Sequence, residues 1–594
     1  MLKKFFLNVL SSFVGAWIAL AGVMIIGIFI FIGIIASIGN NSNTPSVKGH
    51  SILHLCLEGE IEETESRTQL NYMTFASGGV EKRASLRTLV NSLKTAKDNK
   101  NIDALYIECD GVSAGMAALN TLRDAVEDFK KSGKKVYAYG DYLSMGDYFV
   151  ASAADSLFIN PAGSMDVRGI SSTILYMKSF FDKIGLSFTA VKVGTFKSAV
   201  EPYISTSMSE PARAQLDTIY GNMWQYICNK IDSSRKLGKG EFAKMVDNNI
   251  MMLKSADFVK KQKLVDGCIY EMEMTEKLCR LTGKDKESLN LVSPELVGEM
   301  SLPAMSNSKN QVAVLYATGE IAENGNGGID CAELVPEITK LAENDNVKGL
   351  VLRVNSPGGS VFGSEQIAAA LKYFKSKGKP FAVSMGDYAA SGGYWISADA
   401  DRIFADPLTI TGSIGIFGLF PNVEKMVDML GVSPQSVSTS NNGTFPSLFY
   451  APDASQLEQL QIYINSGYNK FINRVSKGRK LSESHVRNIA EGRVWDGMKA
   501  LRLKLVDELG GLDKSIKWVA DKAGIGEKYN VGYYPLYEPG FWDMIIESGK
   551  TDFAQALRSH VKDAVSGQIL DETLRLIRLN PIQAKMIPMR VEMR

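Results

Sequence analysis

The stretch "GDYAASGGYW", from Gly386 to Trp395, is repeated in altered form as "GDYLSMGDYF", from Gly140 to Phe149. The two stretches are offset by 246 residues (386 − 140), and "LFINP" and "IFADP" downstream of them keep the same offset. Solenoid repeats have periods of roughly 20 to 50 residues, far shorter than this offset. The sequence therefore contains one domain twice.

Each copy alternates apolar runs typical of strands with segments typical of helices. Residues 349–354, "GLVLRV", and 380–385, "PFAVSM", are short runs of mainly apolar side chains. Between them, "GSEQIAAALKYFKSKGK" places apolar residues three and four positions apart and closes on a glycine. Alternating strands and helices indicate βαβ units with mainly parallel strand pairing. We therefore predict an α/β fold made of two tandem domains.

Polar composition indicates where the domains begin and end. The stretch 282–310, which contains "GKDKES" and "SNSKNQ", is the predicted linker. It separates an N-terminal domain at 46–281 from a C-terminal domain at 311–528. Residues 529–594 form a tail that carries no assigned motif. The basic and apolar end of this tail, 575–594, would suit a membrane surface or a partner subunit.

The N-terminus has the composition of a membrane span. After Lys4 no charged residue occurs before Lys48, and residues 13–38 are almost entirely apolar. This run exceeds the roughly 20 residues that cross a bilayer core and the roughly 7–15 of a cleavable signal. We therefore predict a cytoplasmic stub and transmembrane anchor at 1–45, with cleavage near Ala36 left open. The lysines before the span place the N-terminus in the cytoplasm and the rest of the chain outside it.

Charge and cysteine content exclude several classes of function. With 66 Lys and Arg against 65 Asp and Glu, the net charge of +1 provides no basic field for nucleic acid. The six cysteines form no C-x-x-C pair, so no zinc or redox site is indicated. We interpret them as free thiols, although the predicted location would permit a disulfide. No cofactor or metal is predicted.

Comparing the two copies points to a divided site. At the first offset Ser391 faces Met145. At a second offset of 249 residues (442 − 193), "VGTFKSA" faces "NGTFPSL", so Lys197 faces Pro446. One copy therefore keeps a lysine without a serine, and the other keeps a serine without a lysine. Independent decay of two copies would not be expected to leave one partner in each, so we predict a single site that uses both.

Serine and lysine together can perform acyl transfer. A serine hydroxyl needs a base to remove its proton, and the usual base is histidine. The chain has only four histidines, and none has sequence support for a triad: His50, His54, His485 and His560. Lysine can replace histidine when burial lowers its pKa from about 10.4 toward neutrality. Lys197 lies beside apolar residues in "TFKSAVEP", a setting compatible with such burial.

The motifs "NSPGGSV", "MGDYAASGGYWIS", "TITGSIGIF" and "GTFKSAVEP" closely resemble those of the long form of bacterial signal peptide peptidase A. The resemblance extends from the anchor to about Gly524. It implies a ClpP/crotonase-like fold of repeated ββα units in each copy. It also implies a homotetramer on the outer face of the cytoplasmic membrane, on the periplasmic side. The implied activity is cleavage of remnant signal peptides after their release from preproteins.

The same resemblance implies a role for each site residue. Ser391 corresponds to the nucleophile and Lys197 to the general base. Ser413, in "TGSIG", matches the serine that hydrogen-bonds the lysine amine. Gly359, in "NSPGG", is expected to form the oxyanion hole together with the N–H of Ser391. A groove for apolar peptides would hold an extended strand by β-augmentation.

Other interpretations of the same residues stay open. A serine at a helix start is often only an N-cap, and a lysine is usually a solvated charge. Glu201, next to the lysine motif, fits a structural partner or a solvated acid better than a catalyst. The chain as a whole could be a crotonase-type acyl-CoA enzyme, which the predicted span disfavours. It could also be a scaffold with a vestigial site, which the retained serine and lysine disfavour.

Overall fold

The computed structural model describes residues 47–64, 83–248, 251–300, 308–323, 328–535, 582–585 and 592–593. The chain divides into two units, Met1–Lys48 and Gly49–Arg594, and both predicted repeats lie in the second unit. The predicted membrane span at 13–38 lies outside the described residues. Among the helices that the structure does describe, none is long and apolar enough to cross a bilayer.

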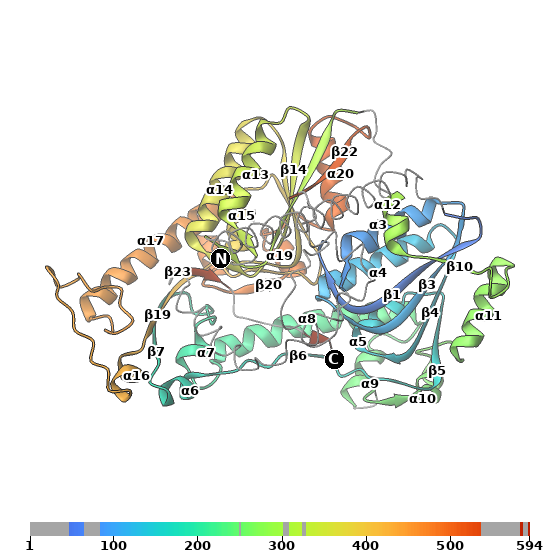
Figure 1. Ribbon diagram of the computed structural model, residues 1–594, viewed down its shortest axis with the longest axis horizontal. Coiled ribbons are helices and arrows are strands. Elements are labelled where there is room, and N and C mark those ends of the chain that lie inside the picture. Colours follow the sequence, from blue (N-terminus) through green and yellow to red (C-terminus); the bar gives the residue numbers. More distant parts are fainter. Residues whose placement is uncertain are drawn as a thin grey trace, which may run out of the picture. The chain divides into compact units, whose positions relative to one another are not determined.

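The N-terminal repeat is built on a mainly parallel sheet with the strand order β10-β1-β3-β4-β5-β8, with β2 beside β1 and β9 beside β5 (Figure 1). Its strands are β1 (Ser51–Glu62), β2 (Arg83–Ser85), β3 (Ile102–Ser113), β4 (Lys135–Leu143), β5 (Ser156–Met165), β8 (Lys254–Ser255), β9 (Gly267–Cys268) and β10 (Asn290–Val292). Its helices are α3 (Leu86–Asp98), α4 (Met116–Lys130), α5 (Met145–Ala151), α8 (Glu210–Ser234), α9 (Glu241–Asp247), α10 (Ala256–Lys261), α11 (Glu271–Thr282) and α12 (Pro294–Met300).

The C-terminal repeat has its own mainly parallel sheet, in the order β20-β18-β16-β14-β11-β22, with β17 between β16 and β21. Its strands are β11 (Gln311–Thr318), β14 (Val347–Ser356), β16 (Phe381–Ala390), β17 (Arg402–Ala405), β18 (Ile410–Gly412), β20 (Val494–Asp496), β21 (Glu508–Leu509) and β22 (Asn530–Tyr534). Its helices are α13 (Cys331–Glu343), α14 (Val361–Ser376), α15 (Gly392–Ser397), α17 (Ala454–Arg479), α18 (Glu483–Ile489), α19 (Gly497–Arg502) and α20 (Leu512–Lys522).

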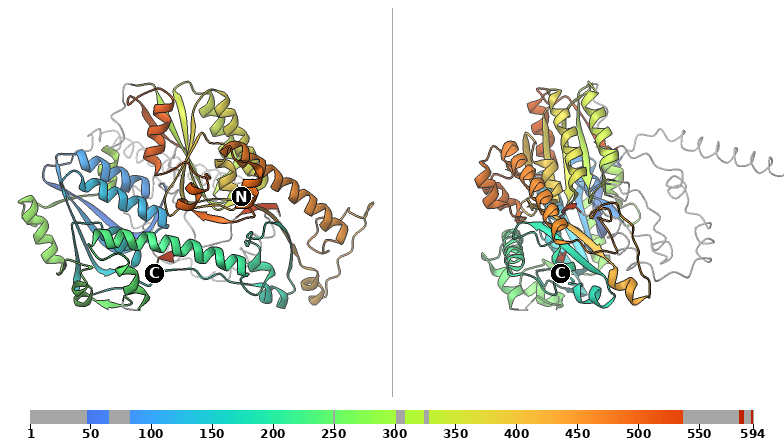
Figure 2. Two further views of the ribbon diagram at one scale, coloured as in Figure 1. Left: turned by 180° about the vertical axis from the view of Figure 1, so that it is seen from behind. Right: turned by 90° about the vertical axis from the view of Figure 1, so that its left-hand side faces the viewer.

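The two sheets share one topology. The parallel series β1-β3-β4-β5 corresponds, strand for strand, to β11-β14-β16-β17. In the C-terminal repeat α13 and α14 cover one face of the sheet and α20 covers the other (Figures 1 and 2). The predicted α/β fold in two copies is therefore confirmed. Within the segment predicted as linker, β10 pairs in parallel with β1 and thus extends the first sheet.

A third sheet crosses between the repeats, in the order β13-β12-β15-β23-β19-β7. Its strands are β7 (Ser187–Val193), β12 (Ile321–Ala322), β13 (Ile329–Asp330), β15 (Gly358–Ser360), β19 (Ile416–Asn422) and β23 (Ile582–Lys585). Strand β7 belongs to the N-terminal repeat and pairs antiparallel with β19 of the C-terminal repeat. Short helices adjoin this ribbon: α6 (Lys178–Lys183), α7 (Glu201–Ile204) and α16 (Glu424–Met429). Strand β24 (Glu592–Met593) pairs with β6 (Ile170–Ser171).

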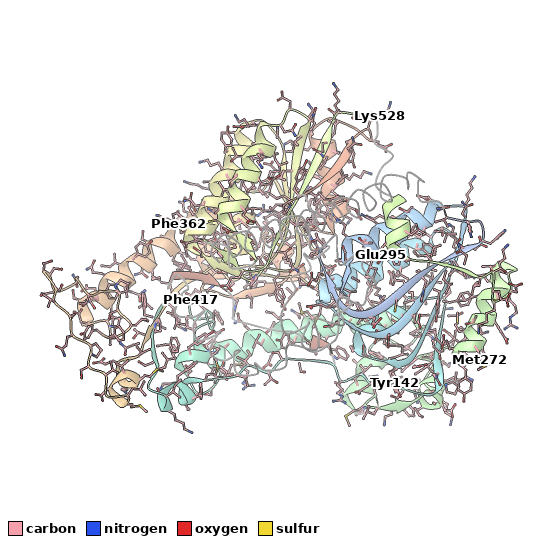
Figure 3. The ribbon with its side chains drawn as sticks, viewed as in Figure 1. Tyr142, Met272, Glu295, Phe362, Phe417 and Lys528 are labelled. Atoms are coloured by element: carbon pink, nitrogen blue, oxygen red, sulfur yellow. The ribbon has the colours of Figure 1, made fainter. Side chains whose placement is uncertain are left out.

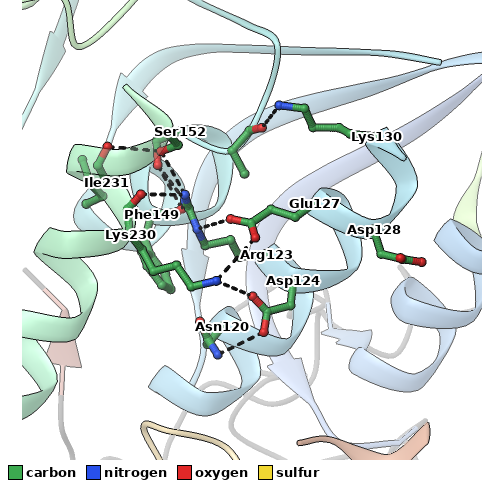
Figure 4. A network of polar contacts seen from close by, with 12 residues as sticks. Asn120, Arg123, Asp124, Glu127, Asp128, Lys130, Phe149, Ser152, Lys230 and Ile231 are labelled. Carbon is green, nitrogen blue, oxygen red and sulfur yellow. Dashed lines mark hydrogen bonds and ion pairs between the residues drawn. The ribbon is translucent and has the colours of Figure 1, made fainter. Parts of the chain in front are cut away.

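Helix α8 extends from the third sheet back to the core of the N-terminal repeat (Figure 1). Its C-terminal end is fixed by Arg123 of α4, whose side chain is fully buried. The guanidinium of Arg123 donates to Ser152 Oγ (2.7 Å), Ser234 Oγ (2.9 Å) and the carbonyl oxygens of Phe149 and Lys230 (Figure 4). A buried arginine is tolerated when its donors find acceptors, so this network holds α8 against α4 and α5.

Charged side chains are buried where the two repeats meet. Arg353 of β14 forms a two-pronged ion pair with Glu63, at 3.0 Å from Nε and 2.9 Å from Nη2. Asp387 accepts hydrogen bonds from the N–H groups of Ala117 and Ala118 at the start of α4 (2.8 and 3.1 Å). Loss of hydration, with the charge of Glu63 added, raises the pKa of Asp387 to about 6. Each contact joins residues of different repeats, so the relative position of the repeats is specified by polar geometry.

Candidate active site

Ser391 lies at a sharp turn between β16 and α15. Its φ of 57° is positive, a conformation that residues other than glycine rarely adopt. Its carbonyl accepts from the N–H of Trp395 (2.8 Å), which starts the helix. Although Ser391 occupies the N-cap position of α15, its side chain makes no capping hydrogen bond. The N-cap interpretation therefore does not describe this hydroxyl, and the strained turn is of a kind found at functional sites.

Lys197 comes from the N-terminal repeat, in the loop between β7 and α7, and is 1% exposed. Its Nζ lies 2.8 Å from Ser391 Oγ, 3.0 Å from Ser413 Oγ and 3.1 Å from the Ser413 carbonyl oxygen. Burial lowers the pKa of Lys197 well below its usual value of 10.5, because the ammonium form loses its hydration. The structure thus brings the two predicted residues into hydrogen-bond contact, with the amine in an environment that favours its neutral form.

Ser413 lies between β18 and β19 and also has a positive φ, of 52°. Its N–H donates to the carbonyl oxygen of Arg493 (2.7 Å). The preceding residue, Gly412, accepts the N–H of Ser391 (2.8 Å). One short segment therefore holds the backbone of Ser391 and presents a hydroxyl to Lys197.

The structure corrects one part of the predicted oxyanion hole. The N–H of Ser391 was expected to contribute, but it is occupied by the Gly412 carbonyl oxygen. The next N–H along the chain, that of Gly392, begins α15, where helical N–H groups lack an intrahelical acceptor. We therefore expect the N–H of Gly392, and not that of Ser391, to join Gly359 in the oxyanion hole. The physical reason is that β16 pairs in parallel with β18, with Ala390 opposite Gly412, so the N–H of Ser391 makes the last hydrogen bond of this ladder.

Gly359 lies in β15 at a position where only glycine fits. A Cβ at this residue would lie 2.2 Å from the carbonyl oxygen of Ile321. Beside it, a Cβ at Gly393 of α15 would lie 2.8 Å from the Ser356 carbonyl oxygen at the end of β14. The absence of side chains therefore lets the strand, the helix start and β12 approach one another closely.

A loop that the sequence did not flag fixes the lysine from the other repeat. The carbonyl oxygen of Glu491 accepts the N–H of Phe196 (2.9 Å), and the N–H of Gly492 donates to Ile414 (2.8 Å). A Cβ at Gly492 would lie 2.6 Å from Lys197 Cβ, so the loop packs directly on the lysine backbone. These contacts use backbone atoms, which leave little trace in the residue types.

Two side chains complete this clamp around Phe196. The guanidinium of Arg493 lies 3.8 Å from the centre of the Phe196 ring, in cation–π geometry. The buried Gln215 of α8 donates to the Phe196 carbonyl oxygen (3.5 Å) and accepts the N–H of Val494 (3.1 Å). Phe196, the residue before Lys197, is thus held at its ring by Arg493 and at its carbonyl oxygen by Gln215. These contacts limit the movement of the Lys197 amine.

The remaining polar candidates have partners elsewhere. Glu201 accepts from the hydroxyl and the N–H of Ser209 (2.7 and 3.1 Å), consistent with a structural role. His50 Nδ1 lies 2.9 Å from Asp103 and His54 Nε2 lies 2.7 Å from Glu108, whereas His560 lies outside the described residues. In the part of the chain that the structure describes, no cluster of His, Cys, Asp or Glu is arranged to hold a metal ion. All six cysteines are free thiols.

The counterpart of the serine turn in the N-terminal repeat has become purely structural. Met145, which faces Ser391 in the alignment of the copies, is fully buried. Ser144 caps α5 instead, and its Oγ lies 2.6 Å from Asp147 in a capping box. Asp147 also accepts the N–H of Val112 (3.1 Å). The first repeat thus keeps the turn and helix without a nucleophile.

Comparison with known proteins agrees with this architecture. The model of "Peptidase family S49" matches residues 128–283 and 373–526, one segment in each repeat, and the "Clp protease" model matches residues 306–405. The chain is 33% identical to "Protease 4" of Salmonella typhi, over 88% of this chain and 86% of that protein. It is also 33% identical to "Protease 4" of Haemophilus influenzae, over 82% of each.

A shorter relative matches only part of the chain. "Putative signal peptide peptidase SppA" of Enterococcus faecium is 32% identical over 39% of this chain and 71% of that protein. Both repeats match the S49 model, and the two longer relatives match most of the chain at an identity above 30%. The chain therefore belongs to peptidase family S49, with two ClpP-like repeats, and is a serine peptidase of that family.

Proposed function

We propose that this chain is a membrane-anchored peptidase in which Lys197 acts as general base for Ser391. The observation that carries the proposal is the 2.8 Å separation of Lys197 Nζ and Ser391 Oγ, formed by an amine that is 1% exposed. A base must lie within about 2.6–3.2 Å of the proton donor and titrate near the working pH. Burial moves the pKa of Lys197 in the required direction.

The reaction would begin with attack of Ser391 Oγ on the carbonyl carbon of a peptide. The hydroxyl proton passes to the neutral amine of Lys197, and the resulting oxyanion is held by backbone N–H groups. Gly359 and Gly392 are the residues proposed to supply them. Oxyanion donors of this kind are worth roughly 10²–10³ in kcat when one is removed.

Collapse of this intermediate completes acyl-enzyme formation. The ammonium of Lys197 returns its proton to the leaving amide nitrogen as the C–N bond breaks. The neutral amine then deprotonates a water molecule, which hydrolyses the acyl ester and frees Ser391. Ser413, 3.0 Å from Nζ, accepts one amine hydrogen and so directs the nitrogen lone pair toward Ser391.

We further propose apolar remnant signal peptides as substrates, cleaved on the periplasmic side of the cytoplasmic membrane. The apolar run at 13–38 supports an anchor with a cytoplasmic N-terminus. The name of the Enterococcus relative is consistent with this substrate class. A homotetramer is part of the proposal, supported by large apolar side chains that are exposed around α16, among them Met429 (67%) and Leu430 (73%). The near-zero net charge gives no support for a nucleic-acid partner.

Covalent labelling tests the proposed mechanism. The detergent-solubilised full chain is treated with a fluorophosphonate probe and mapped by peptide mass spectrometry. Wild type, Ser391→Ala and Lys197→Met are compared with Lys183→Met, which removes an exposed amine from the same repeat. We expect labelling at Ser391 in wild type and Lys183→Met, and none in the other two. Equal labelling of Lys197→Met would refute the lysine as base, and an unlabelled folded wild type would favour a vestigial scaffold.

A further inference from the structure

Helix α4 of the N-terminal repeat takes its N-terminal cap from the other repeat. Its own N-cap residue is Gly115, which has no side chain that could accept a hydrogen bond. The N–H groups of Ala117 and Ala118 instead donate to one carboxylate oxygen, Oδ1 of Asp387 (2.8 and 3.1 Å). The first N–H groups of a helix lack intrahelical acceptors, and Asp is among the preferred capping side chains. Asp387 therefore does for α4 what Gly115 cannot do.

The corresponding helix of the C-terminal repeat is capped within its own repeat. At the offset of 245 residues (346 − 101) that aligns "NIDALYIECDG" with "NVKGLVLRVNS", Gly115 corresponds to Ser360. The hydroxyl of Ser360 accepts the N–H of Gly363 (3.0 Å) and caps α14. One copy of the helix thus has a local cap, whereas the other copy depends on a distant carboxylate.

The carboxylate also differs between the copies. At the offset of 246 residues Asp387 corresponds to Asp141, which accepts the hydroxyl of Tyr139 (2.8 Å) within its own repeat. Tyr142, which follows Asp141, and Phe362, the second residue of α14, lie on different repeats and are 69% and 56% exposed (Figure 3). In the described part of the chain, the cap therefore extends from the repeat of the serine to the repeat of the lysine.

The small size of Gly115 makes this contact possible. A Cβ on Gly115 would overlap Asp387, and the three atoms nearest to it all belong to the carboxylate. The backbone of Gly115 is extended (φ −66°, ψ 158°), a conformation that any residue adopts. A larger residue at position 115 is therefore excluded by the carboxylate and not by the backbone.

On the side of the serine, Asp387 lies four residues before Ser391 in a bulge of β16. Between two successive pairs of the β14–β16 ladder, β14 advances by two residues and β16 by four. Asn355 fixes this bulge, because its Oδ1 accepts the N–H of Tyr388 (3.0 Å). After the bulge, β16 pairs with β18 up to the turn of Ser391. Bulges of this kind re-aim side chains beside active sites.

On the side of the lysine, α4 is connected to the support of Lys197. Arg123 of α4 donates to Ser234 Oγ near the C-terminal end of α8 (2.9 Å). In the first turns of α8, Gln215 donates to the carbonyl oxygen of Phe196, the residue before Lys197 (3.5 Å). The cap on α4 therefore joins the strand of the serine to the pair of helices that supports the lysine.

Two further carboxylates of the C-terminal repeat contact the same two helices. Asp406 accepts from Asn120 of α4 (2.8 Å), and Asp496 accepts from Asn222 of α8 (2.9 Å). These contacts remain when Asp387 is replaced, so the repeats should stay docked. Of the three carboxylates, Asp387 is the closest to the serine along the chain.

We propose that Asp387 is a positioning residue of this peptidase: by capping α4 of the other repeat, it sets the alignment of Ser391 with Lys197. The inference rests on the proposed function, because it concerns the same serine and lysine. The charge of the side chain suits this role, since the aligned peptide dipoles stabilise an anion at the N-terminus of a helix. Asp387 itself has no contact with the reacting atoms.

The test measures kinetics of the full chain in detergent at pH 8, where Asp387, with a pKa raised to about 6, is ionised. Asp387→Ala is expected to lower kcat for an apolar peptide by about tenfold or more and to change KM by less than about twofold, since only the alignment of the reacting groups is affected. Labelling of Ser391 by the fluorophosphonate probe should slow in parallel. Asp387→Asn keeps an oxygen that can accept both N–H groups and should restore most of kcat. Asp345→Ala removes an exposed carboxylate of the same repeat and should match wild type.

A double variant separates positioning from helix stability. In Asp387→Ala combined with Gly115→Ser, the space of the carboxylate is free and the new serine can cap α4 as Ser360 caps α14. The melting temperature lost in Asp387→Ala is expected to return, whereas kcat is expected to stay low, because the new cap does not join the repeats. Recovery of kcat together with the melting temperature would show that Asp387 only stabilises the helix, and would overturn the inference.

Wild type distinguishes failure of this inference from failure of the proposed function. If wild type cleaves the peptide and takes the probe at Ser391, and Asp387→Ala does both at the same rate, the positioning role is wrong and the peptidase proposal stands. If folded wild type does neither, the proposed function fails and the inference fails with it.

Discussion

Replacing Lys197 with methionine tests the proposed base most directly. Methionine keeps an unbranched apolar stem in a site that is 1% exposed, so the fold should survive the exchange. The change removes the amine that lies 2.8 Å from Ser391 and 3.0 Å from Ser413 Oγ. It therefore separates the chemistry of the amine from the packing of the side chain.

The expected kinetic loss follows from the role of a general base. Such groups contribute roughly 10²–10⁴ in rate, and each factor of ten corresponds to about 1.4 kcal/mol in the activation barrier. We therefore expect kcat/KM for an apolar peptide to fall by about 10² or more in Lys197→Met. Background attack by an unassisted serine would account for any residual rate.

The same substitution should also change how the free energy of unfolding depends on pH. The pKa of Lys197 in the folded protein is well below 10.5, the usual value that applies when the chain is unfolded. Between these two pKa values the unfolded chain binds one proton more than the folded protein. The stability of wild type therefore rises with pH in this window, by about 1.4 kcal/mol per pH unit. Lys197→Met lacks this contribution.

Urea unfolding of wild type and Lys197→Met at pH 8 and pH 9, followed by tryptophan fluorescence, measures the effect. The difference in unfolding free energy should move in favour of wild type by about 1.4 kcal/mol between the two pH values. Lys183→Met, at an exposed lysine, serves as the matched control and should show no such change. A difference that is the same at both pH values would mean that Lys197 is charged in the folded protein, and the reasoning for a lysine base would be refuted.

Three further substitutions test other parts of the site and the repeat boundary. Ser413→Ala removes one hydrogen bond of about 1 kcal/mol to the amine, so we expect hydrolysis to slow by about tenfold or less, with a shifted pH–rate profile; an unchanged rate and profile would contradict the orienting role. Gly359→Ala places a Cβ 2.2 Å from the Ile321 carbonyl oxygen, so β15 must shift and carry the N–H of residue 359 out of position. We expect kcat to fall by roughly 10²–10³, the loss of one oxyanion donor, together with a lower melting temperature; near-normal turnover would exclude Gly359 from the oxyanion hole. Burial raises the pKa of Asp406, which accepts from Asn120 of the other repeat (2.8 Å), to about 7, so the folded protein binds more protons than the unfolded chain between about pH 4 and 7. The melting temperature of wild type relative to Asp406→Asn should therefore fall as pH rises through that range, and a pH-independent difference would argue against a protonated carboxyl.

The α/β architecture and the pair Ser391 and Lys197 could be predicted because the two copies of the domain can be compared residue by residue. The motifs around both positions match between the copies, whereas the serine aligns with Met145 and the lysine aligns with Pro446. These two differences therefore identify the candidate residues. Strand and helix alternation then fixed the α/β class. Their physical meeting requires β7 to pair with β19 of the other repeat in the third sheet, and no residue pattern indicated that pairing.

What could not be predicted depends on backbone atoms and on contacts distant in sequence. The N–H of Ser391 is bound to the Gly412 carbonyl oxygen because β16 pairs with β18, a pairing of backbone groups that no residue type marks. The loop of Glu491 and Gly492 holds the lysine mainly through carbonyl and N–H groups, which every residue possesses. The strand at 582–585 lies in a tail whose composition suggested a membrane surface or a partner subunit, whereas the strand pairs with β15 and β19 of the same chain.

The ribbon of β7 and β19 also decides where this chain can be divided. Its pairs extend from Ile416 facing Val193 to Asn422 facing Ser187, so each strand supplies the other with hydrogen-bond partners. In a shortened chain with only the C-terminal repeat, β19 would become an exposed edge strand. Its unpaired N–H and C=O groups could then pair with strands of other molecules. Sequence boundaries that look like natural ends would then yield a protein prone to aggregation. For expression and crystallisation, the pair of repeats is the smallest practical unit.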